Sequence, residues 1–129
     1  MLDSMRQYKA GVFRALAHPT RVAIVEFLNY GEMSVGHLCE KIGLEQSNAS
    51  QHLAVLRNKH IVQTRKDGNQ IYYSLGDPAF GQVLQTLRAF FLAHLNETLE
   101  LVQREQKAAD RAEATRPKVR KTARREVNR

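Results

Sequence analysis

Residues 43–57 read Gly-Leu-Glu-Gln-Ser-Asn-Ala-Ser-Gln-His-Leu-Ala-Val-Leu-Arg, and this is the most informative part of the sequence. Within it, Ala49, Leu53 and Leu56 recur at steps of four and three residues, which predicts a helix over 46–57 with one narrow apolar stripe. The opposite face carries short, uncharged polar side chains. A solvent-facing helix usually prefers Glu and Lys there, because they are better helix formers than Ser and Asn. The outward face therefore indicates hydrogen bonding to another molecule.

Three shorter helices are predicted before this one. Val12 and Leu16 lie on the apolar face of a first helix, and Pro19 is typical of the first position of a second. We expect Gly31 to end the second helix as a left-handed cap. Ser34 is a suitable N-cap for a third helix, which Gly43 would close.

After residue 61 the apolar pattern changes to alternation, which predicts two strands over 62–65 and 71–75. The intervening Asp67-Gly68 favours a tight hairpin turn. On the second strand one set of side chains should face the core and the other set should face away. The inward set is Ile71, Tyr73 and Leu75, and the outward set is Gln70 and Tyr72.

A long helix is predicted from Asp77-Pro78, with Asp at the N-cap. Its apolar side chains step by three or four residues for more than six turns, as Phe80, Leu84, Leu87, Phe91, Leu95, Leu99 and Val102. One small domain cannot cover a stripe of that length. The pattern therefore predicts a partner helix, most simply from a second copy of the chain, and thus a homodimer formed through the terminal helices.

Charge is unevenly distributed over the 129 residues. The formal net charge is +7, but residues 1–102 hold ten basic and nine acidic side chains, whereas residues 103–129 hold ten and four. We therefore expect a nearly neutral domain over 1–102 and a basic, mobile tail over 103–129. The excess of positive charge suggests a polyanionic partner, without distinguishing DNA, RNA and acidic protein.

Composition excludes several classes of protein. The longest apolar run, residues 89–93, is far shorter than the about 20 residues of a membrane span, and no secretory signal is apparent. Cys39 is the only cysteine, so no intrachain disulfide can form. A cytoplasmic protein without membrane association is expected. No nucleophile–base pair, phosphate loop or metal site has credible spacing, so we expect neither an enzyme nor a cofactor or metal.

Helix, turn, helix and a two-stranded hairpin together form a winged helix-turn-helix, a mainly α fold with a small β-hairpin. A helix with a polar outer face fits the major groove of double-stranded DNA. The runs at 15–21 (Ala-Leu-Ala-His-Pro-Thr-Arg), 43–57, 65–68 (Arg-Lys-Asp-Gly) and 71–75 (Ile-Tyr-Tyr-Ser-Leu) resemble the ArsR/SmtB family of bacterial repressors. The resemblance covers roughly residues 5–100. It implies a homodimeric, sequence-specific repressor that binds an inverted-repeat operator and leaves it in response to an effector.

Carried over by motif, the resemblance assigns DNA contacts to the polar helix face and to the hairpin. The helix positions are Gln46, Ser47, Asn48, Ser50, Gln51 and His52, and the wing positions are Arg65, Lys66 and Gln70. His52 is equally well interpreted as a scaffold residue. Arg21 is expected either to touch phosphate or to pair with a carboxylate.

The effector sites of known family members match only in part. Ser34 and Gly36 stand where thiolate sensors carry their cysteine pair. His94 and Glu97 match half of a zinc site, whose other half falls on Gly81 and Val83. The run Ser-Val-Gly-His-Leu-Cys at 34–39 resembles the branch that senses reactive sulfur, and Leu92 stands near its second cysteine. The effector is therefore unknown.

Two alternatives stay open at this point. Cys39 is either a structural small hydrophobe or a redox-sensing thiol. The chain is either a sequence-specific repressor or a nonspecific architectural DNA-binding protein driven by its basic tail.

Overall fold

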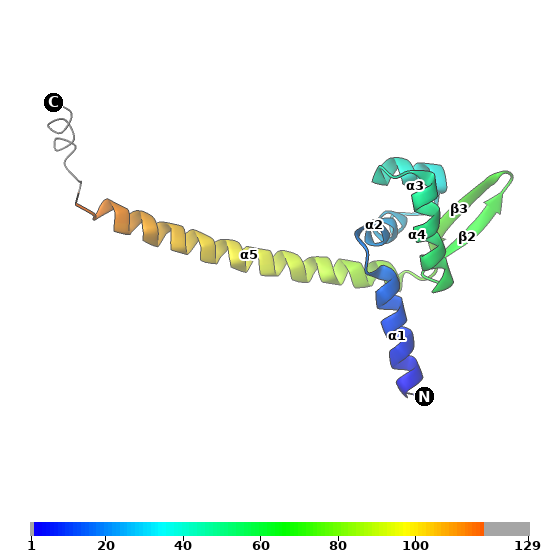
Figure 1. Cartoon of the computed structure of the whole chain (residues 1–129), viewed down its shortest axis with the longest axis horizontal. Coiled ribbons are helices and arrows are strands. Elements are labelled where there is room, and N and C mark those ends of the chain that lie inside the picture. Colours follow the sequence, from blue (N-terminus) through cyan, green and yellow to red (C-terminus); the bar gives the residue numbers. More distant parts are fainter. Residues whose placement is uncertain (1, 118–129) are drawn as a thin grey trace, which may run out of the picture. The chain divides into compact units, whose positions relative to one another are not determined.

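The computed structural model describes residues 2–117, which divide between Arg88 and Ala89 into two compact units that are treated separately below. Five helices and three strands follow one another along the described part (Figure 1). They are α1 (Leu2–Leu16), α2 (Pro19–Leu28), β1 (Met33–Ser34), α3 (Val35–Ile42), α4 (Gln46–Asn58), β2 (Val62–Asp67), β3 (Gln70–Leu75) and α5 (Ala79–Ala114). Among these residues no helix combines the length and apolarity needed to cross a membrane.

The core of the first unit lies where α2, α3, α4 and the start of β2 meet. The predicted stripe of α4 is confirmed, since Ala49, Leu53 and Leu56 are all buried. Around them lie the other buried apolar residues, Ala15, Leu16, Ile24, Val25, Leu28, Leu38, Ile61 and Val62. Each fully buried Leu or Ile stabilises the fold by about 1.5–3 kcal/mol. This packing fixes α4 along one side and leaves its polar side in solvent.

Helix ends follow the predicted chemistry at four of five places, one of them the Asp77 cap of α5 described below. Pro19 opens α2, the Ser34 hydroxyl accepts a hydrogen bond from the His37 amide, and Gly43 adopts the left-handed conformation after α3. The prediction for Gly31 was wrong, because α2 ends at Leu28 and its C-cap is Asn29 in a right-handed conformation. The Asn29 amide already reaches back to Val25 and Phe27, so no left-handed residue is needed there.

The hairpin belongs to a three-stranded antiparallel sheet with the order β1-β3-β2. The strand β1 was not predicted, because two residues give no alternation to detect. Asp67 pairs with Gln70, so the turn is Gly68-Asn69, with Gly68 at φ 60. Tyr73 pairs with Thr64 and packs against the core as predicted.

Two sequence expectations for the hairpin and the long helix need correction. Ile71 is 46% exposed, because the outer half of the wing extends beyond the core that Tyr73 and Leu75 reach. The helix α5, capped by the Asp77 carboxylate on the Ala79 amide, continues to Ala114. Residues 103–114 are therefore helical, since Ala, Gln, Glu, Lys and Arg sustain a helix without an apolar stripe. Part of the predicted basic tail, 118–129, lies outside the described residues.

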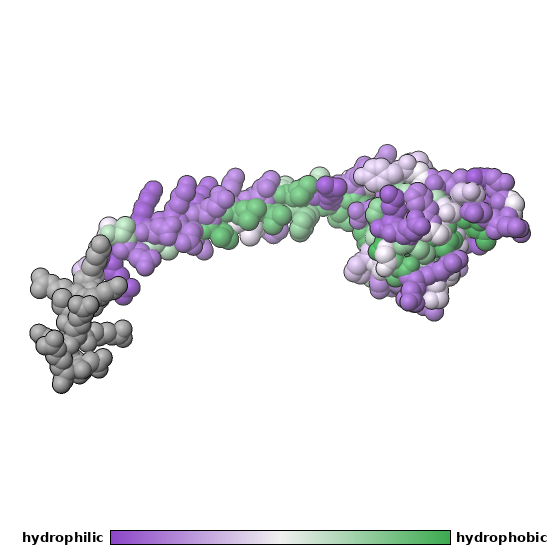
Figure 2. All heavy atoms as spheres, turned by 90° about the horizontal axis from the view of Figure 1, so that it is seen from above, coloured by the Kyte–Doolittle hydropathy of each residue, from purple (hydrophilic) through white to green (hydrophobic). Residues whose placement is uncertain are grey.

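The second unit begins within α5. Between Ala89 and Val102 this helix exposes large apolar side chains in two adjacent rows, Phe90, Phe91, Leu92, Leu95, Leu99, Leu101 and Val102. Figure 2 shows them as hydrophobic surface along the helix. Beyond Val102 the described part of the helix carries only Gln, Arg, Glu, Lys, Asp and Ala side chains up to Ala114. Within the described part of this unit nothing covers the apolar rows.

Candidate nucleic-acid interface

The predicted recognition surface is the outward side of α4. Its five polar positions are all exposed: Gln46, Ser47, Asn48, Ser50 and Gln51. The Ser50 hydroxyl donates to the Gln46 carbonyl oxygen at 2.9 Å, which leaves its lone pairs as acceptors. Four exposed amide or hydroxyl side chains remain without a side-chain partner among the described residues. The helix thus presents both donors and acceptors to solvent.

The N-terminus of α4 is open to an anion. Glu45 is its N-cap, yet the Glu45 side chain makes no capping hydrogen bond, and the first turn contains no acidic residue. The first backbone amides of the helix therefore keep their donors free. Such amides and the helix dipole favour a phosphate group at this end.

His52 lies differently from the other α4 positions. It is half-buried, and its ring lies 4.4 Å from that of His18, measured between centroids. The Nδ1 atom of His18 in turn accepts a hydrogen bond from the Thr20 amide, so His18 caps α2. Burial lowers the pKa of His52, and the nearby charges of His18 and Arg21 lower it further. The geometry favours the scaffold interpretation, in which the neighbouring rings of His18 and His52 join α4 to the start of α2.

Arg21 supports the same junction. Its Nη1 atom donates to the Ala15 carbonyl oxygen at 2.9 Å, at the end of α1. Its Nε atom is buried and has no hydrogen-bond partner in the described part of the chain. Arg21 has no carboxylate partner among the described residues, and a backbone carbonyl takes that place.

Arg65, one of the predicted wing contacts, is held by two carboxylates. Its Nε and Nη2 atoms donate to Glu32 at 3.1 and 2.6 Å, and Asp67 lies 3.6 Å from Nη1. The guanidinium also lies over the Tyr72 ring, 4.8 Å from its centroid. The hydrogen bond from Arg65 lowers the pKa of Glu32, and the same contact raises the pKa of Arg65. The other wing positions, Lys66 and Gln70, are exposed and have no side-chain partner among residues 2–117.

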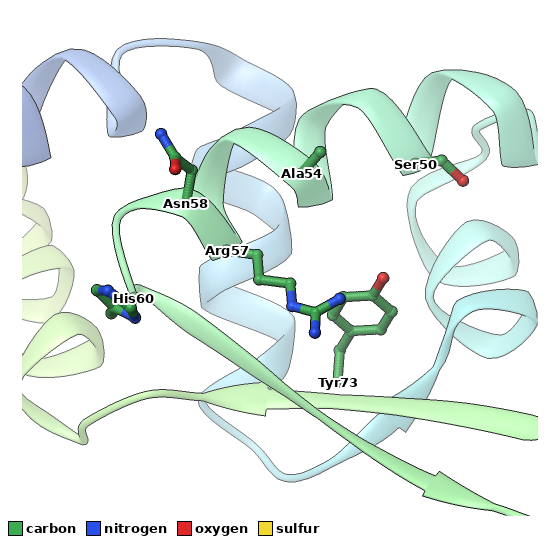
Figure 3. Close-up of a pocket in the computed structure, with 6 residues that line it drawn as sticks. All are labelled: Ser50, Ala54, Arg57, Asn58, His60 and Tyr73. Carbon is green, nitrogen blue, oxygen red and sulfur yellow. The ribbon is translucent and has the colours of Figure 1, made fainter.

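A hollow of about 490 Å³ separates the second half of α4 from the wing (Figure 3). It is lined by Ser50, Ala54, Arg57, Asn58, His60 and Tyr73. Of these, only Ser50 was named as a DNA contact from the sequence. Ser50, Ala54 and Arg57 are spaced by four and three residues, so they lie along one face of α4. Extending the predicted polar face of this helix beyond residue 52 would therefore have identified the helical wall of the hollow. Its other wall, on β3, is not visible in the sequence.

Four of the positions matched to known effector sites, Ser34, Gly81, His94 and Cys39, make contacts within the protein. Ser34 is the N-cap of α3, and Gly81 packs so closely on Asn29 that a Cβ atom would overlap the side-chain amide. His94 stacks on Phe90 within the second unit, with 6.3 Å between ring centroids. Cys39 is half-buried and packs against the core. Within residues 2–117 no three His, Cys, Asp or Glu side chains are grouped to hold a metal.

Residues 18–64, from the cap of α2 into β2, match the model of the bacterial regulatory protein, arsR family. A regulator from Mycobacterium tuberculosis, Rv0081, is 36% identical over 102 residues, which span 78% of this chain and 90% of the relative. The chain belongs to the ArsR family. Its uncharacterized relative Rv0081 has a crystal structure that matches 74% of this chain and 96% of that one, with a TM-score of 0.68 and 38% identity.

Two further solved structures match at similar levels. NolR from Sinorhizobium fredii has a TM-score of 0.64 and 38% identity, covering 69% of this chain and 89% of its own. The transcriptional repressor BigR from Xylella fastidiosa has a TM-score of 0.64 and 37% identity, covering 70% and 92%. The winged helix-turn-helix predicted for this ArsR-family chain is thus confirmed.

Proposed function

We propose that this protein is a homodimeric transcriptional repressor that binds an inverted-repeat DNA operator in the bacterial cytoplasm. The observation that carries the proposal is the exposed, uncharged polar face at the N-terminal half of α4, with a wing beside it. Amide and hydroxyl side chains can donate to and accept from base edges in the major groove. The membership in a family of regulatory proteins supports the same interpretation.

In this proposal the α4 side chains read bases, and the wing holds the backbone. Gln46, Ser47, Asn48, Ser50 and Gln51 form the reading face, since they are exposed at the end of the helix that approaches bases most closely. Lys66 and Gln70 supply wing contacts. His52 and Arg65 act as positioning residues, because each is engaged by other side chains of the protein.

The homodimer rests on uncovered apolar surface. In the first unit, α1 and the start of α5 form a hollow of about 230 Å³ that is almost entirely apolar, lined by Tyr8, Lys9, Val12, Phe13, Leu16, Phe80 and Val83. In the second unit α5 exposes its two apolar rows. Surfaces of this kind are usually covered by a partner. A second copy related by a two-fold axis would present two α4 helices to the two halves of an inverted repeat.

The effector acts on that dimer in the same proposal, by favouring one dimer geometry over another. Cys39 is the candidate trigger that the sequence offers. Its packing against the core favours a structural role, whereas its partial exposure permits slow access by an oxidant or persulfide. Comparing operator release by wild type and by Cys39→Ser after such treatment decides between these roles.

Selection of the sequences that the purified protein binds, from a pool of random double-stranded DNA, tests the proposal. We expect one inverted-repeat sequence to emerge. A variant truncated after residue 102 provides the second arm, because the architectural alternative places most of the binding in the basic tail over 103–129. Enrichment of the same sequence by both proteins supports the repressor. No enrichment, together with loss of binding on truncation, supports the architectural alternative.

A further inference from the structure

The hollow between α4 and the wing carries positive charge without a neutralising partner among its lining residues. We propose that it binds one phosphodiester group of the DNA backbone, with Arg57 and Tyr73 as its ligands. The inference rests on the proposed DNA binding and adds a site to it. Of the six residues that line the hollow, Arg57 is the permanently charged one and none is acidic.

Arg57 differs sharply from Arg65. Both ion pairs found among residues 2–117 belong to Arg65, whose guanidinium is held by Glu32 and Asp67. Arg57 is exposed and takes part in no such pair and in no side-chain hydrogen bond within the same residues. Its planar guanidinium therefore keeps all its donors for a ligand. That arrangement of donors matches two oxygens of a phosphate group.

Tyr73 provides the opposite wall. In Figure 3 the Arg57 side chain extends from α4 towards the Tyr73 ring on β3. Tyr73 is half-buried and packs against the core, so its ring is held in place, and its hydroxyl lines the hollow as a further donor. The Ser50 hydroxyl at the other end already donates to Gln46, so Ser50 can only accept there. Arg57 and Tyr73 thus supply donors from the two facing walls, and Asn58 and His60 are the other donor-bearing residues of the lining.

The two walls are joined by a rigid corner. His60, between α4 and β2, has φ 58, a left-handed conformation that costs about 1–3 kcal/mol for a residue other than glycine. Its carbonyl oxygen occupies the place that a Cβ atom on Gly76 would take, and the Gly76 amide donates to the Ile61 carbonyl oxygen at 2.8 Å. The end of α4 and the end of β3 are thus locked together. A site formed before the ligand arrives loses less entropy on binding.

The position of the hollow suits the backbone rather than the bases. Arg57 follows Ser50 by seven residues, about 10 Å further along the helix axis. When the N-terminal half of α4 lies among the bases, its C-terminal half lies at the edge of the groove, where the phosphates are. Phosphate contacts position a protein on DNA without carrying sequence information directly. Loss of Arg57 should therefore weaken binding to all sequences alike.

The test compares Arg57→Ala with Arg6→Ala, which removes the same charge from an exposed position on α1. Binding to the enriched sequence and to random DNA is measured over a range of salt concentrations. We expect Arg57→Ala to weaken both at least tenfold at low salt, with an unchanged ratio between them. The slope of log K for DNA binding against log salt concentration should become shallower by about 0.9, which is the value for one lost phosphate contact. Arg57→Lys should keep the salt dependence but bind more weakly than wild type.

A second measurement locates the phosphate. Neutral methylphosphonates replace single phosphates of the enriched sequence. We expect the replacement at one position in each half-site to lower the DNA affinity of wild type but not that of Arg57→Ala. Equal behaviour of Arg57→Ala and Arg6→Ala overturns the proposal, and so does relaxed specificity at one base pair. Saturation of the hollow by inorganic phosphate with a dissociation constant below about 1 mM in an NMR titration overturns the DNA assignment, because the free anion would then suffice as the ligand. If wild type shows no sequence preference yet Arg57→Ala still flattens the salt dependence, the operator function fails and the phosphate site stands.

Discussion

Glu32, in the loop before β1, accepts two hydrogen bonds from Arg65 on β2, at 2.6 and 3.1 Å. This pair ties the wing to the loop after α2 and neutralises the one wing arginine. The same guanidinium lies over the Tyr72 ring. The wing is therefore held in place by this contact. Among the described residues it has one unpaired cationic side chain, Lys66, instead of the two that the sequence predicts.

Replacing Glu32 by Gln should remove the closer of the two carboxylates that neutralise Arg65, while Asp67 stays 3.6 Å from its Nη1 atom. The Arg65 guanidinium would then be available to a phosphate, so we expect Glu32→Gln to make the salt dependence of DNA binding steeper by about one unit. Glu26→Gln, at an exposed position on α2, is the matched control because it removes the same charge without freeing an arginine. Identical salt dependence in the two variants would show that Arg65 stays out of reach of DNA.

Protonation of His52 should lower stability in acid. Burial and the positive neighbours His18 and Arg21 lower its pKa in the folded state below the ordinary value of 6.5. The unfolded chain then binds the proton more readily, so stability is complete above pH 6.5 and falls as the pH decreases from there to the folded-state pKa. Urea unfolding of wild type and His52→Gln over this range should show the variant with the flatter profile. His37→Gln, at an exposed position, should keep the slope of wild type.

The glycine at position 76 is required by close packing. A Cβ atom there would overlap the His60 carbonyl oxygen, and backbone cannot yield as a side chain can. We expect Gly76→Ala to lower the free energy of unfolding by about 1–3 kcal/mol or more. Gly36→Ala is the matched control, since nothing lies within 4 Å of the place that its Cβ atom would take inside α3. That substitution should instead stabilise by about 0.5–1 kcal/mol, and equal effects would refute the packing argument.

The N-cap of α3 gives a further stability test. The Ser34 hydroxyl accepts from the His37 amide at 3.2 Å, and Ser34→Ala removes this acceptor. We expect a loss of about 1 kcal/mol in the free energy of unfolding. Ser47→Ala, at an exposed position of α4 whose side chain makes no hydrogen bond within the described region, should change stability little. Thermal or urea unfolding of the pair distinguishes capping from a general effect of removing serine.

Local sequence patterns were sufficient to predict the features that depend on residues close together in the sequence. The stripe Ala49, Leu53 and Leu56 and the caps at Ser34 and Gly43 are of this kind. They depend on periodicity and on short-range hydrogen bonds, which single residues report directly.

The remainder depends on contacts between distant residues. Glu32 and Arg65 are 33 residues apart, and no spacing rule joins them. The packing of Gly81 on Asn29 likewise links α5 to the end of α2. The strand β1 forms only because β3 is present to pair with it, and the second wall of the hollow, Tyr73, becomes visible only when the sheet is folded. The exposed polar face of α4 could therefore be predicted, whereas the geometry of the wing could not.

Competition between the enriched operator and random DNA, at physiological salt, tests the central claim most directly. The measurement compares wild type with Gln51→Ala, because Gln51 lies on the exposed reading face of α4. We predict that wild type prefers the operator by about 10³-fold or more. Gln51→Ala should lose about 1–3 kcal/mol of that preference while its binding to random DNA is unchanged. Equal competition by random DNA, or an unchanged preference in Gln51→Ala, would contradict the account.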